Sequence, residues 1–442
     1  MAITPFDSAL YRDLMHDPEI GKLFTDSAEV RAMMLVEGAL ARAQGKLGVI
    51  PELSANFIHR AAMEVQIDPA GLAEETGRNA VPVPALLAAF RKAMEAPEHA
   101  QYLHFGATSQ DIMDTGLVLR LRQVLALLET RLTGLLDRLA DLAEAHAETP
   151  MAARTYGQAA TPTSFGAVVA DWGTPLLRHV GQLDALRDDV LQVSLSGAAG
   201  TLAAMGPEGP AVRKALAQEL GLHDPETSWH STRDQIARLA GWLSQLTVSL
   251  GKIGEDLLLM SQSVQGEITL SQGGSSSTMP QKQNPVQPSA LVALARMSVG
   301  LNSVLQGAGL HRQQRDGAAW MTEWLSLPQL CMAAGQASRI AVDMCRGMTP
   351  DTAAMRSNID DGRGLIYAEA LSFALASAMP RMEAQEAVKA LCRDVLEDGG
   401  SLAEKARATW PDSGLEALFT PEAQLGDAPA QARRFAAAAR AS

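Results

Sequence analysis

The stretch "LRQVLALLETRLTGLLDRLADL" (residues 121–142) decides the fold class of this 442-residue chain. Its leucines recur at alternating intervals of four and three residues, at Leu121, Leu125, Leu128, Leu132, Leu135, Leu139 and Leu142. This spacing places every leucine on one side of an α-helix, so the stripe can face neighbouring helices over many turns. The stretch therefore predicts a long helix in the interior of a helical bundle.

Two further runs repeat the pattern. One has apolar residues at Ile236, Leu239, Leu243, Leu246, Leu250, Ile253, Leu257 and Met260, and the other at Ala290, Leu294, Met297, Leu301 and Val304. A helix of about 30 residues spans roughly 45 Å, which is longer than a compact monomeric domain needs. Several such helices side by side predict a long bundle shared between subunits.

The composition also favours helices, because 47% of residues are hydrophobic, mostly Ala and Leu, and only 4% are aromatic. We find no convincing strand alternation and no internal repeat. Shorter helical patterns precede the long runs, and a smaller Ala-rich region follows "RGMTPDTAAM" (346–355), where Thr349 before Pro350, with Asp351, indicates a helix start. The sequence thus predicts an all-α fold with an N-terminal helical domain (1–110), a central long-helix bundle (111–350) and a C-terminal helical domain (351–442).

The charge and the cysteines limit the classes of partner. A formal net charge of −13 makes a nucleic acid an unlikely partner, so an anionic substrate requires local positive charge in a cleft. We find no signal peptide and no uncharged apolar stretch of about 18 residues, so we expect no membrane span and a cytoplasmic location. The three cysteines, scattered along the chain, are expected to be buried thiols in a reducing compartment.

Polar residues gather in the breaks between the long helices. In "HFGATSQDIMDT" (104–115), the adjacent hydroxyls of Thr108 and Ser109 suit either a helix cap or a bound carboxylate or phosphate. His104 suits either a packed core position or a site. In "ARTYGQAATPTSFG" (153–166), Arg154 and Gln158 belong to a short loop crowded with donors, although a surface arginine is the ordinary interpretation.

Two later breaks carry further cations. In "SWHSTRDQIARL" (228–239), Arg233 lies in the first helical turn, where a cation opposes the helix dipole and hints at an anionic partner. In "HRQQRDGAAWMTEWLSLPQL" (311–330), Arg315 belongs to a basic turn that solvation alone would explain.

The segment "GGSSSTMPQKQNP" (273–285) suits either a linker or a catalytic loop. Its paired glycines permit the backbone angles of an anion-binding nest. A catalytic serine needs donors or a cation to stabilise its alkoxide, and Lys282 is the cation that the loop provides. Such a loop suits proton abstraction next to a carboxylate.

Together these segments resemble the fumarase/aspartase superfamily, whose members share the pattern Gly-Ser-Ser-x-Met-Pro-x-Lys-x-Asn-Pro. "SSSTMPQKQNP" (275–285) matches it except that Ser275 replaces the glycine, and "HFGATSQDIMDTG" and "RTYGQAATPTSFG" are similar to the other two signature regions. The regions appear in the family's order, so the resemblance covers essentially the whole chain. It implies a homotetramer in which regions from three different subunits meet in each active site.

The resemblance also implies roles for individual residues. Ser276 matches the family's general base, and Lys282 and Asn284 match the residues that hold the substrate carboxylate and its enolate form. Thr108 and Ser109 match the family's carboxylate-binding pair. His104 matches a substrate-contacting histidine of the adenylosuccinate lyases.

One position departs from the family pattern. Adenylosuccinate lyases, argininosuccinate lyases and fumarases usually have a histidine where this chain has Tyr156. An amine or hydroxide needs a proton donor to leave, and tyrosine, with a pKa of about 10, is a poor donor at neutral pH. A carboxylate leaves without protonation, which indicates lactone opening or, in reverse, lactone closure.

This departure indicates the branch formed by the bacterial 3-carboxy-cis,cis-muconate cycloisomerases of protocatechuate degradation, which the stretches "HFGATSQDIMDTGLVLRLR" and "WHSTRD" also resemble. The implied substrate is a small tricarboxylate, and no metal or organic cofactor is implied. Two alternatives stay open, which are an adenylosuccinate lyase-like β-elimination and a catalytically silent structural tetramer. The residues expected to bind the substrate are His104, Thr108, Ser109, Arg154, Gln158, Arg233, Asn284 and Arg315, beside the catalytic Ser276 and Lys282.

Overall fold

The computed structural model describes residues 4–271, 274–275, 278–279, 282–411 and 413–441. The chain forms two compact units, each built from three stretches of sequence. Unit 1 comprises Met1–Thr130, Gly181–Val248 and Ala293–Arg339, and unit 2 comprises Arg131–Val180, Ser249–Val292 and Ile340–Ser442. The division into three domains at residues 110 and 350 stays a prediction.

Four long helices contribute residues to both units, and these are α8 (Ser109–Ala145), α12 (Asp234–Met260), α13 (Val286–Ala308) and α14 (Gly317–Gly347). The prediction of buried stripes is confirmed for the first two runs, since every apolar residue of the 121–142 and 236–260 series is buried. In the third run Ala290 and Leu294 are buried, but Val304 is 46% exposed. The stripe prediction is therefore wrong at the C-terminal end of α13.

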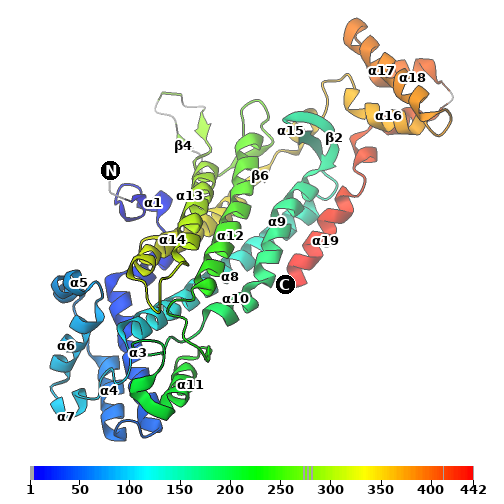
Figure 1. The fold of residues 1–442 in the computed structure, drawn as a ribbon. Helices are drawn as coiled ribbons and strands as arrows, with labels where there is room; N and C mark the ends of the chain where they lie inside the picture. Colours follow the sequence, from blue (N-terminus) through cyan, green and yellow to red (C-terminus); the bar gives the residue numbers. More distant parts are fainter. Residues whose placement is uncertain (1–3, 272–273, 276–277, 280–281, 412, 442) are drawn as a thin grey trace. The chain divides into compact units, whose positions relative to one another are not determined.

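The N-terminal part of unit 1 is a cluster of helices in which α3 (Asp26–Lys46) packs along α4 (Glu52–Glu64), as Figure 1 shows. The Thr25 side chain caps α3 by accepting a hydrogen bond from the Ala28 N–H. Acidic residues in the first turn interact favourably with the positive end of the helix dipole. The remaining helices of unit 1 are α1 (Arg12–Met15), α2 (Pro18–Gly21), α5 (Ala73–Asn79), α6 (Val83–Met94), α7 (Pro97–Ala100), α10 (Leu183–Val190) and α11 (Gly209–Leu220), with 3-10 helices η1 (Pro5–Asp7), η2 (Lys22–Phe24), η3 (Pro69–Leu72) and η4 (Ala203–Glu208).

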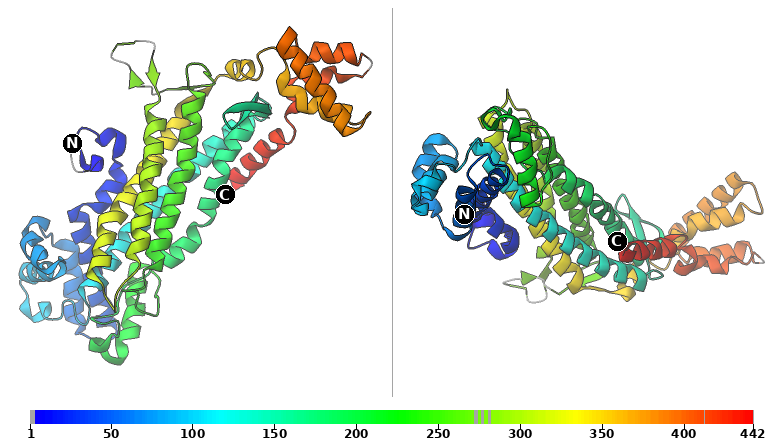
Figure 2. Two further views of the ribbon diagram at one scale, coloured as in Figure 1. Left: turned by 45° about the horizontal axis from the view of Figure 1, so that its top comes forward. Right: turned by 90° about the horizontal axis from the view of Figure 1, so that it is seen from below.

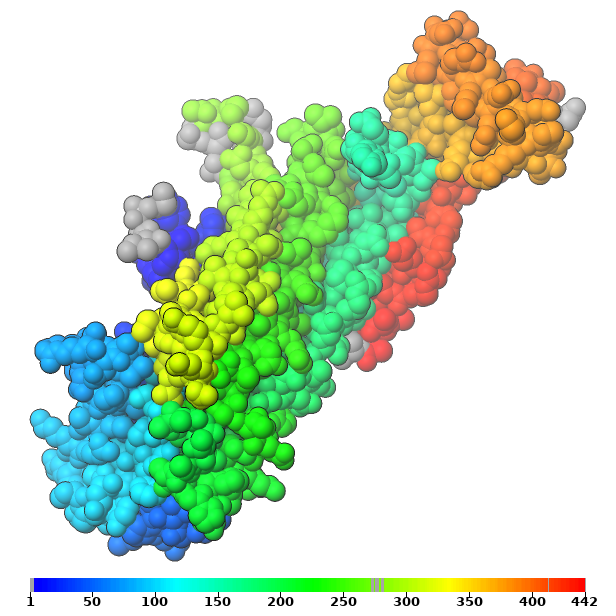
Figure 3. All heavy atoms as spheres, viewed as in Figure 1, coloured from blue at the N-terminus to red at the C-terminus, as the bar shows by residue number. Residues whose placement is uncertain are grey.

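In unit 2 the segment predicted to be a loop around residue 154 is a β-hairpin, which corrects the prediction. Strand β1 (Pro150–Thr155) pairs antiparallel with β2 (Gln158–Ser164), and Thr155 lies opposite Gln158. Tyr156 and Gly157 form the two-residue connection, and both have positive φ, as the tight hairpin turn of type I′ requires. The hairpin lies at the surface of the molecule in Figure 3 (teal).

The rest of unit 2 is largely helical. A small core of Leu371, Val388 and Leu402 joins three helices, shown in orange in Figure 2. The described elements are α9 (Phe165–Gly181), α15 (Thr352–Ser357), α16 (Ala368–Leu375), α17 (Arg381–Asp398), α18 (Leu402–Thr409) and α19 (Ala428–Ala441), η5 (Leu365–Tyr367), η6 (Leu415–Phe419) and η7 (Pro421–Gln424), and the antiparallel pairs of β3 (Ile268–Leu270) with β6 (Met348–Pro350) and of β4 (Gly274–Ser275) with β5 (Gln283–Asn284). Helix α15 confirms the predicted helix start with Asp351 as its N-cap, whereas Thr349 and Pro350 belong to strand β6.

Helix α13 is, within the described residues, the one helix long and apolar enough to cross a membrane by length and composition. A packed core helix has the same composition. Leu291 and Leu294 of α13 are buried, and Arg296 lies within the helix. Packing therefore explains the apolar character of the buried side of α13. The overall fold is predominantly helical, as predicted.

Candidate active site

The predicted site residues divide between the two units, and each unit is described by itself. Ser276, the predicted general base, lies outside the described residues. Unit 1 holds His104, Thr108, Ser109, Arg233 and Arg315, whereas unit 2 holds Arg154, Gln158, Lys282 and Asn284.

In unit 1 a turn of residues 104–108 leads into α8. The Thr108 N–H donates to Asp111 Oδ2 at 3.0 Å, which closes the start of the helix with a carboxylate. Thr108 and Ser109 are half-buried at this end of α8. The structure therefore brings two neighbouring hydroxyls to the positive end of a helix dipole, an arrangement that suits an anion.

His104 lies in the same turn and contacts a carboxylate that the sequence analysis missed. Its Nδ1 lies 2.6 Å from Oε1 of Glu37 on α3, and the Glu37 side chain is fully buried. Burial lowers the pKa of His104, but the charge and hydrogen bond of Glu37, with a smaller contribution from Asp111, outweigh burial and the opposing charge of Arg91. The pKa of His104 is therefore raised above its ordinary value, which favours the imidazolium form.

Asp111 ties three segments of unit 1 together. Its carboxylate is buried and accepts hydrogen bonds from the backbone N–H groups of Ser196 and Gly197 at 2.8 and 3.0 Å, as well as from that of Thr108. It also lies 2.7 Å from Nε2 of the buried His230. A carboxylate with so many donors fixes the turn before α8 relative to the 194–200 loop and the 228–233 segment.

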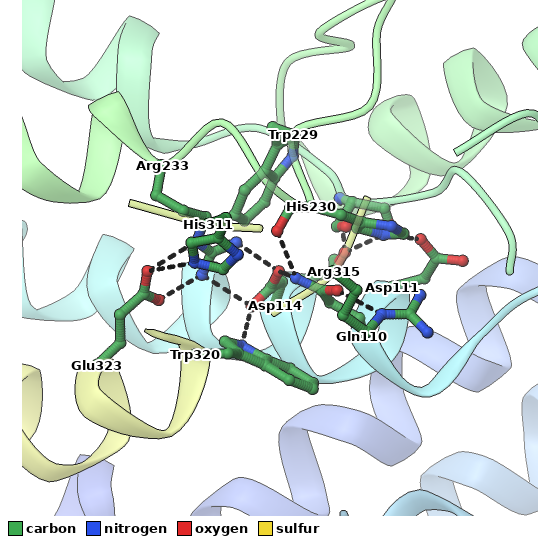
Figure 4. Close-up of polar contacts among 12 residues, drawn as sticks. Gln110, Asp111, Asp114, Trp229, His230, Arg233, His311, Arg315, Trp320 and Glu323 are labelled. Carbon is green, nitrogen blue, oxygen red and sulfur yellow. Dashed lines mark hydrogen bonds and ion pairs between the residues drawn. The ribbon is translucent and has the colours of Figure 1, made fainter. Parts of the chain in front are cut away.

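Arg233 lies just before α12 and belongs to a buried ion cluster, shown in Figure 4. Its guanidinium donates to both oxygens of Asp114 at 2.6 and 3.2 Å and to both oxygens of Glu323 at 2.8 and 2.5 Å. Trp320 Nε1 donates to Asp114 at 3.2 Å, and the Arg233 guanidinium stacks 4.7 Å from the ring of Trp229.

This cluster corrects the interpretation of Arg233. The position of Arg233 in the sequence predicted that it binds an anionic ligand. In the structure its anionic partners are Asp114 and Glu323 of the same chain. The Arg233 side chain is only 1% exposed, and burial opposes its charge while Asp114 and Glu323 raise its pKa above the ordinary range. Arg233 therefore holds Asp114 and Glu323 in place, and the contacts in this structure do not support the predicted contact of Arg233 with the substrate.

Arg315 is differently placed, since it lies in an exposed turn next to the ion cluster (Figure 4). Its Nε donates to the Gln110 side chain at 2.8 Å and its Nη2 to the Ala198 carbonyl at 3.2 Å. Both acceptors are neutral, so the positive charge of Arg315 is available to an anion. The neighbouring His311 side chain is fully buried, and burial together with Arg233 lowers its pKa, so this imidazole is neutral.

In unit 2, Arg154 on β1 makes a two-point contact with Glu267. The distances from its Nη1 and Nη2 to the two carboxylate oxygens are 3.0 and 2.5 Å. Glu267 is fully buried and also accepts a hydrogen bond from Asn358 Nδ2 at 3.1 Å. The Arg154 side chain is 25% exposed, and Glu267 largely balances its charge. Its role toward a substrate stays a prediction.

The tip of the hairpin carries Tyr156, whose exposed fraction reaches 106%. Gln158 is likewise exposed as the first residue of β2. A tyrosine without burial gains nothing for the fold, so its position is one that a ligand or another chain can contact.

Lys282 and Asn284 lie in the segment that leads into α13. Lys282 is exposed, and its backbone N–H donates to the Met279 carbonyl at 3.0 Å. Asn284 is half-buried on β5, opposite Gly274 of β4. The strand pair thus places an exposed ammonium two residues from an amide, a set of donors that suits a developing negative charge.

The sequence analysis missed four buried carboxylates, which are Glu37, Asp114, Glu267 and Glu323. Each lies close to apolar residues in the sequence, which was the available signal. Within the described part of the chain, no group of three or more His, Cys, Asp or Glu side chains is arranged to hold a metal ion. The arrangement offers hydroxyls, amides and cations that suit an anionic substrate.

Comparisons with known proteins extend along almost the whole chain. A family model described as lyase matches residues 15–300. A 3-carboxy-cis,cis-muconate cycloisomerase of Pseudomonas aeruginosa is 40% identical, with 93% of this chain and 92% of that relative covered. The protein of the same name from Bradyrhizobium diazoefficiens is 39% identical over 90% of this chain and 88% of the relative. The crystal structure of the 3-carboxy-cis,cis-muconate lactonizing enzyme from Pseudomonas putida superposes with a TM-score of 0.92 at 34% identity, and covers 98% of this chain and 99% of that chain.

Proposed function

The chain belongs to the lyase family of the fumarase/aspartase superfamily, and from this membership we propose that it is a 3-carboxy-cis,cis-muconate cycloisomerase. The proposed reaction interconverts 3-carboxy-cis,cis-muconate and 4-carboxymuconolactone in protocatechuate degradation. The observation that carries the proposal is the match, at 39 and 40% identity, to two relatives of this name over at least 90% of the chain.

In the proposed mechanism, one carboxylate oxygen of the substrate adds to the conjugated double bond. A C–O bond forms, and the π electron pair moves to the carbon next to another carboxylate, which becomes an enediolate. Lys282 and Asn284 stabilise this charge, and the exposure of the Lys282 ammonium supports this assignment. The Ser276 hydroxyl then gives its proton to the carbon, and in the reverse direction the serine removes that proton.

The remaining carboxylates of the substrate need their own contacts. We assign them to Thr108 and Ser109 at the start of α8, to His104, and to Arg315. The hydrogen-bond acceptors of Arg315 within the chain are neutral, so its positive charge is available to a carboxylate. Arg154 and Gln158 on the hairpin are assigned to the same task. Tyr156 in place of the family's histidine fits this reaction, because the carboxylate leaving group of the lactone needs no general acid.

We further propose that the protein is a homotetramer with active sites shared between subunits. Apolar side chains on the long helices that are 46–70% exposed support this proposal, and these are Val248 and Leu259 on α12, Val299 and Val304 on α13, and Leu325 on α14. Sedimentation equilibrium should give about four times the chain mass of 46.9 kDa, and a monomer would overturn this part of the proposal.

The test of the function is an ultraviolet assay that follows the loss of 3-carboxymuconate absorbance with the purified protein. We expect turnover, and we expect Ser276→Ala to abolish it while the far-ultraviolet circular dichroism stays unchanged. Cleavage of adenylosuccinate in place of carboxymuconate would indicate the β-elimination alternative. Turnover of neither substrate would indicate a silent scaffold.

A further inference from the structure

We propose that Glu37 is a positioning residue that holds His104 as a cationic hydrogen-bond donor to one carboxylate of the substrate. The identity of that substrate rests on the proposed function. The hold of Glu37 on His104 does not rest on it, because that contact is intrinsic to unit 1.

The contact has the geometry of an ion pair. His104 Nδ1 and Glu37 Oε1 are 2.6 Å apart, which is at the short end for a charge-assisted hydrogen bond. Glu37 is fully buried, and its second oxygen, Oε2, has no hydrogen-bond partner among the described residues. A buried carboxylate with one free oxygen is costly unless a cation lies next to it. His104 is therefore needed as the imidazolium.

The backbone supports a functional reason for this placement. His104 has a φ of 65°, in the left-handed region that side-chain-bearing residues seldom adopt. The buried Gln44 and the exposed Arg91 brace the turn around it, because Gln44 Nε2 donates to the Phe105 carbonyl at 2.7 Å and Arg91 Nη2 donates to the Leu103 carbonyl at 3.3 Å. Strain of this kind persists where the surroundings impose it, as they do at binding sites.

The orientation of the ring follows from the Glu37 contact. Since Nδ1 faces the buried carboxylate, the other ring nitrogen, Nε2, is left to donate outward, and it has no partner in the part of the chain that the structure describes. The imidazole is 15% exposed, and it lies in the turn that leads to the hydroxyls of Thr108 and Ser109. The turn thus carries an imidazolium N–H four and five residues before the two hydroxyls, and on the proposed function we assign these donors to the carboxylates of the substrate.

The charge state depends on three groups that face His104 from the elements around it. These are Glu37 on α3 and Asp111 on α8, which raise the pKa of His104, and Arg91 on α6, which lowers it against a background of burial that also lowers it. Removal of the Glu37 charge should therefore shift the pKa of His104 downward. The imidazolium would then be lost at a lower pH than in the wild type.

The experiment measures kcat and KM for 3-carboxymuconate between about pH 5.5 and 9 in the wild type and in Glu37→Gln. In the wild type, KM should stay constant below the pKa of His104 and rise above it. In Glu37→Gln the rise should begin at lower pH, so that KM is about tenfold higher near pH 7.5 and converges with the wild type at the acid end. The value of kcat should change little, because His104 binds and does not transfer the proton.

Gln44→Met is the matched control. Gln44 lies two helical turns from Glu37 on α3, is equally buried, and braces the same turn without a charge. Its loss should raise KM by the same factor at every pH. An identical KM inflection in Glu37→Gln and the wild type, or an equal shift of the inflection in Gln44→Met, would overturn the proposal.

A second measurement does not depend on turnover. The ¹³Cε1 resonance of His104 in the wild type, assigned by its loss in His104→Gln, should titrate above pH 6.5. Glu37→Asp, which keeps the charge, should shift this titration less than Glu37→Gln does. If His104 of the wild type titrates below pH 6.5, the positioning role of Glu37 is wrong. If His104 titrates above pH 6.5 but the protein does not turn over 3-carboxymuconate, only the proposed function is wrong.

Discussion

The ion cluster around Arg233 in unit 1 and the polar segments of unit 2 use their cations in opposite ways. Arg233 is 1% exposed and gives hydrogen bonds to both oxygens of Asp114 and of Glu323, so the chain itself satisfies its charge. Lys282 and the hairpin tip with Tyr156 are exposed. The polar groups of the ion cluster hold segments of unit 1 together, whereas Lys282 and the hairpin tip of unit 2 are exposed to solvent.

The difference shows how to distinguish cations that stabilise the fold from cations that can bind a substrate, although the two kinds look alike in the sequence. A buried cation with two carboxylates cannot meet a further anion without losing one of them, and its removal leaves two unpaired buried charges. An exposed cation contributes little to folding but can bind a ligand. Substitutions in the two regions should therefore act on different observables, stability for the ion cluster around Arg233 and turnover for the exposed segments of unit 2.

The largest expected effect is on stability, from Arg233→Met. Because Asp114 and Glu323 would be left buried without a counter-charge, the free energy of unfolding should fall by about 3–5 kcal/mol, measured by urea denaturation. Arg238→Met is the control, since Arg238 lies five residues further on, in the first turns of α12, and forms an ion pair with Asp189 at the surface. Its loss should change stability by less than about 1 kcal/mol. Equal losses in both variants would remove the distinction between the regions.

Lys282→Met should produce the reverse pattern. On the proposed function, we expect kcat to fall by about 10²–10³-fold, because the enediolate would lose a cation that stabilises its charge. The melting temperature should stay at the wild-type value, since the Lys282 side chain is exposed. Lys252→Met serves as control, because Lys252 is an exposed lysine that forms an ion pair on α12 and should affect neither observable. A stable variant with full kcat would assign the charge stabilisation elsewhere.

The sequence was sufficient for the long helices and insufficient for the buried charges. The leucines of 121–142 and the apolar residues of 236–260 are all buried, because spacing within one helix determines which side chains share a face. The Arg233 partners could not be predicted in the same way. Asp114 lies 119 residues from Arg233 and Glu323 lies 90 residues from it, and no local pattern fixes distances between such segments.

The hairpin was missed for a different reason. The strands consist largely of Ala, Thr and other small or polar residues, so alternation of apolar and polar positions is weak. The turn is Tyr156–Gly157 in place of the usual Asn-Gly or Asp-Gly. His104, Thr108 and Ser109 were identified together because they are neighbours in the sequence, whereas Glu37 escaped notice since its partner lies 67 residues away.

A smaller effect is expected from Gly157→Ala at the hairpin tip. Gly157 has a φ of 73°, and a Cβ at this position would meet no atom within 4 Å, so only the backbone conformation resists alanine. Stability should fall by about 1 kcal/mol, because the left-handed conformation is unfavourable for alanine. Gly134→Ala in α8 offers the matched contrast, since that glycine is helical with equally open surroundings. It should raise stability by about 0.5–1 kcal/mol, and a loss there would show that space, not backbone, decides.

The smallest expected effect tests the exposed region most directly. Tyr156→Phe removes only a hydroxyl from a side chain that the fold leaves in solvent, so stability should stay constant. If the leaving group is a carboxylate, no proton donor is needed there, and kcat for lactone opening should stay within about twofold of the wild type. A general acid at this position would instead contribute about 10²–10⁴-fold, so a loss of that size in Tyr156→Phe would restore proton donation to the hairpin tip. Because the hydroxyl is absent at every pH, the kcat profile of the variant should also keep the wild-type shape on its alkaline side.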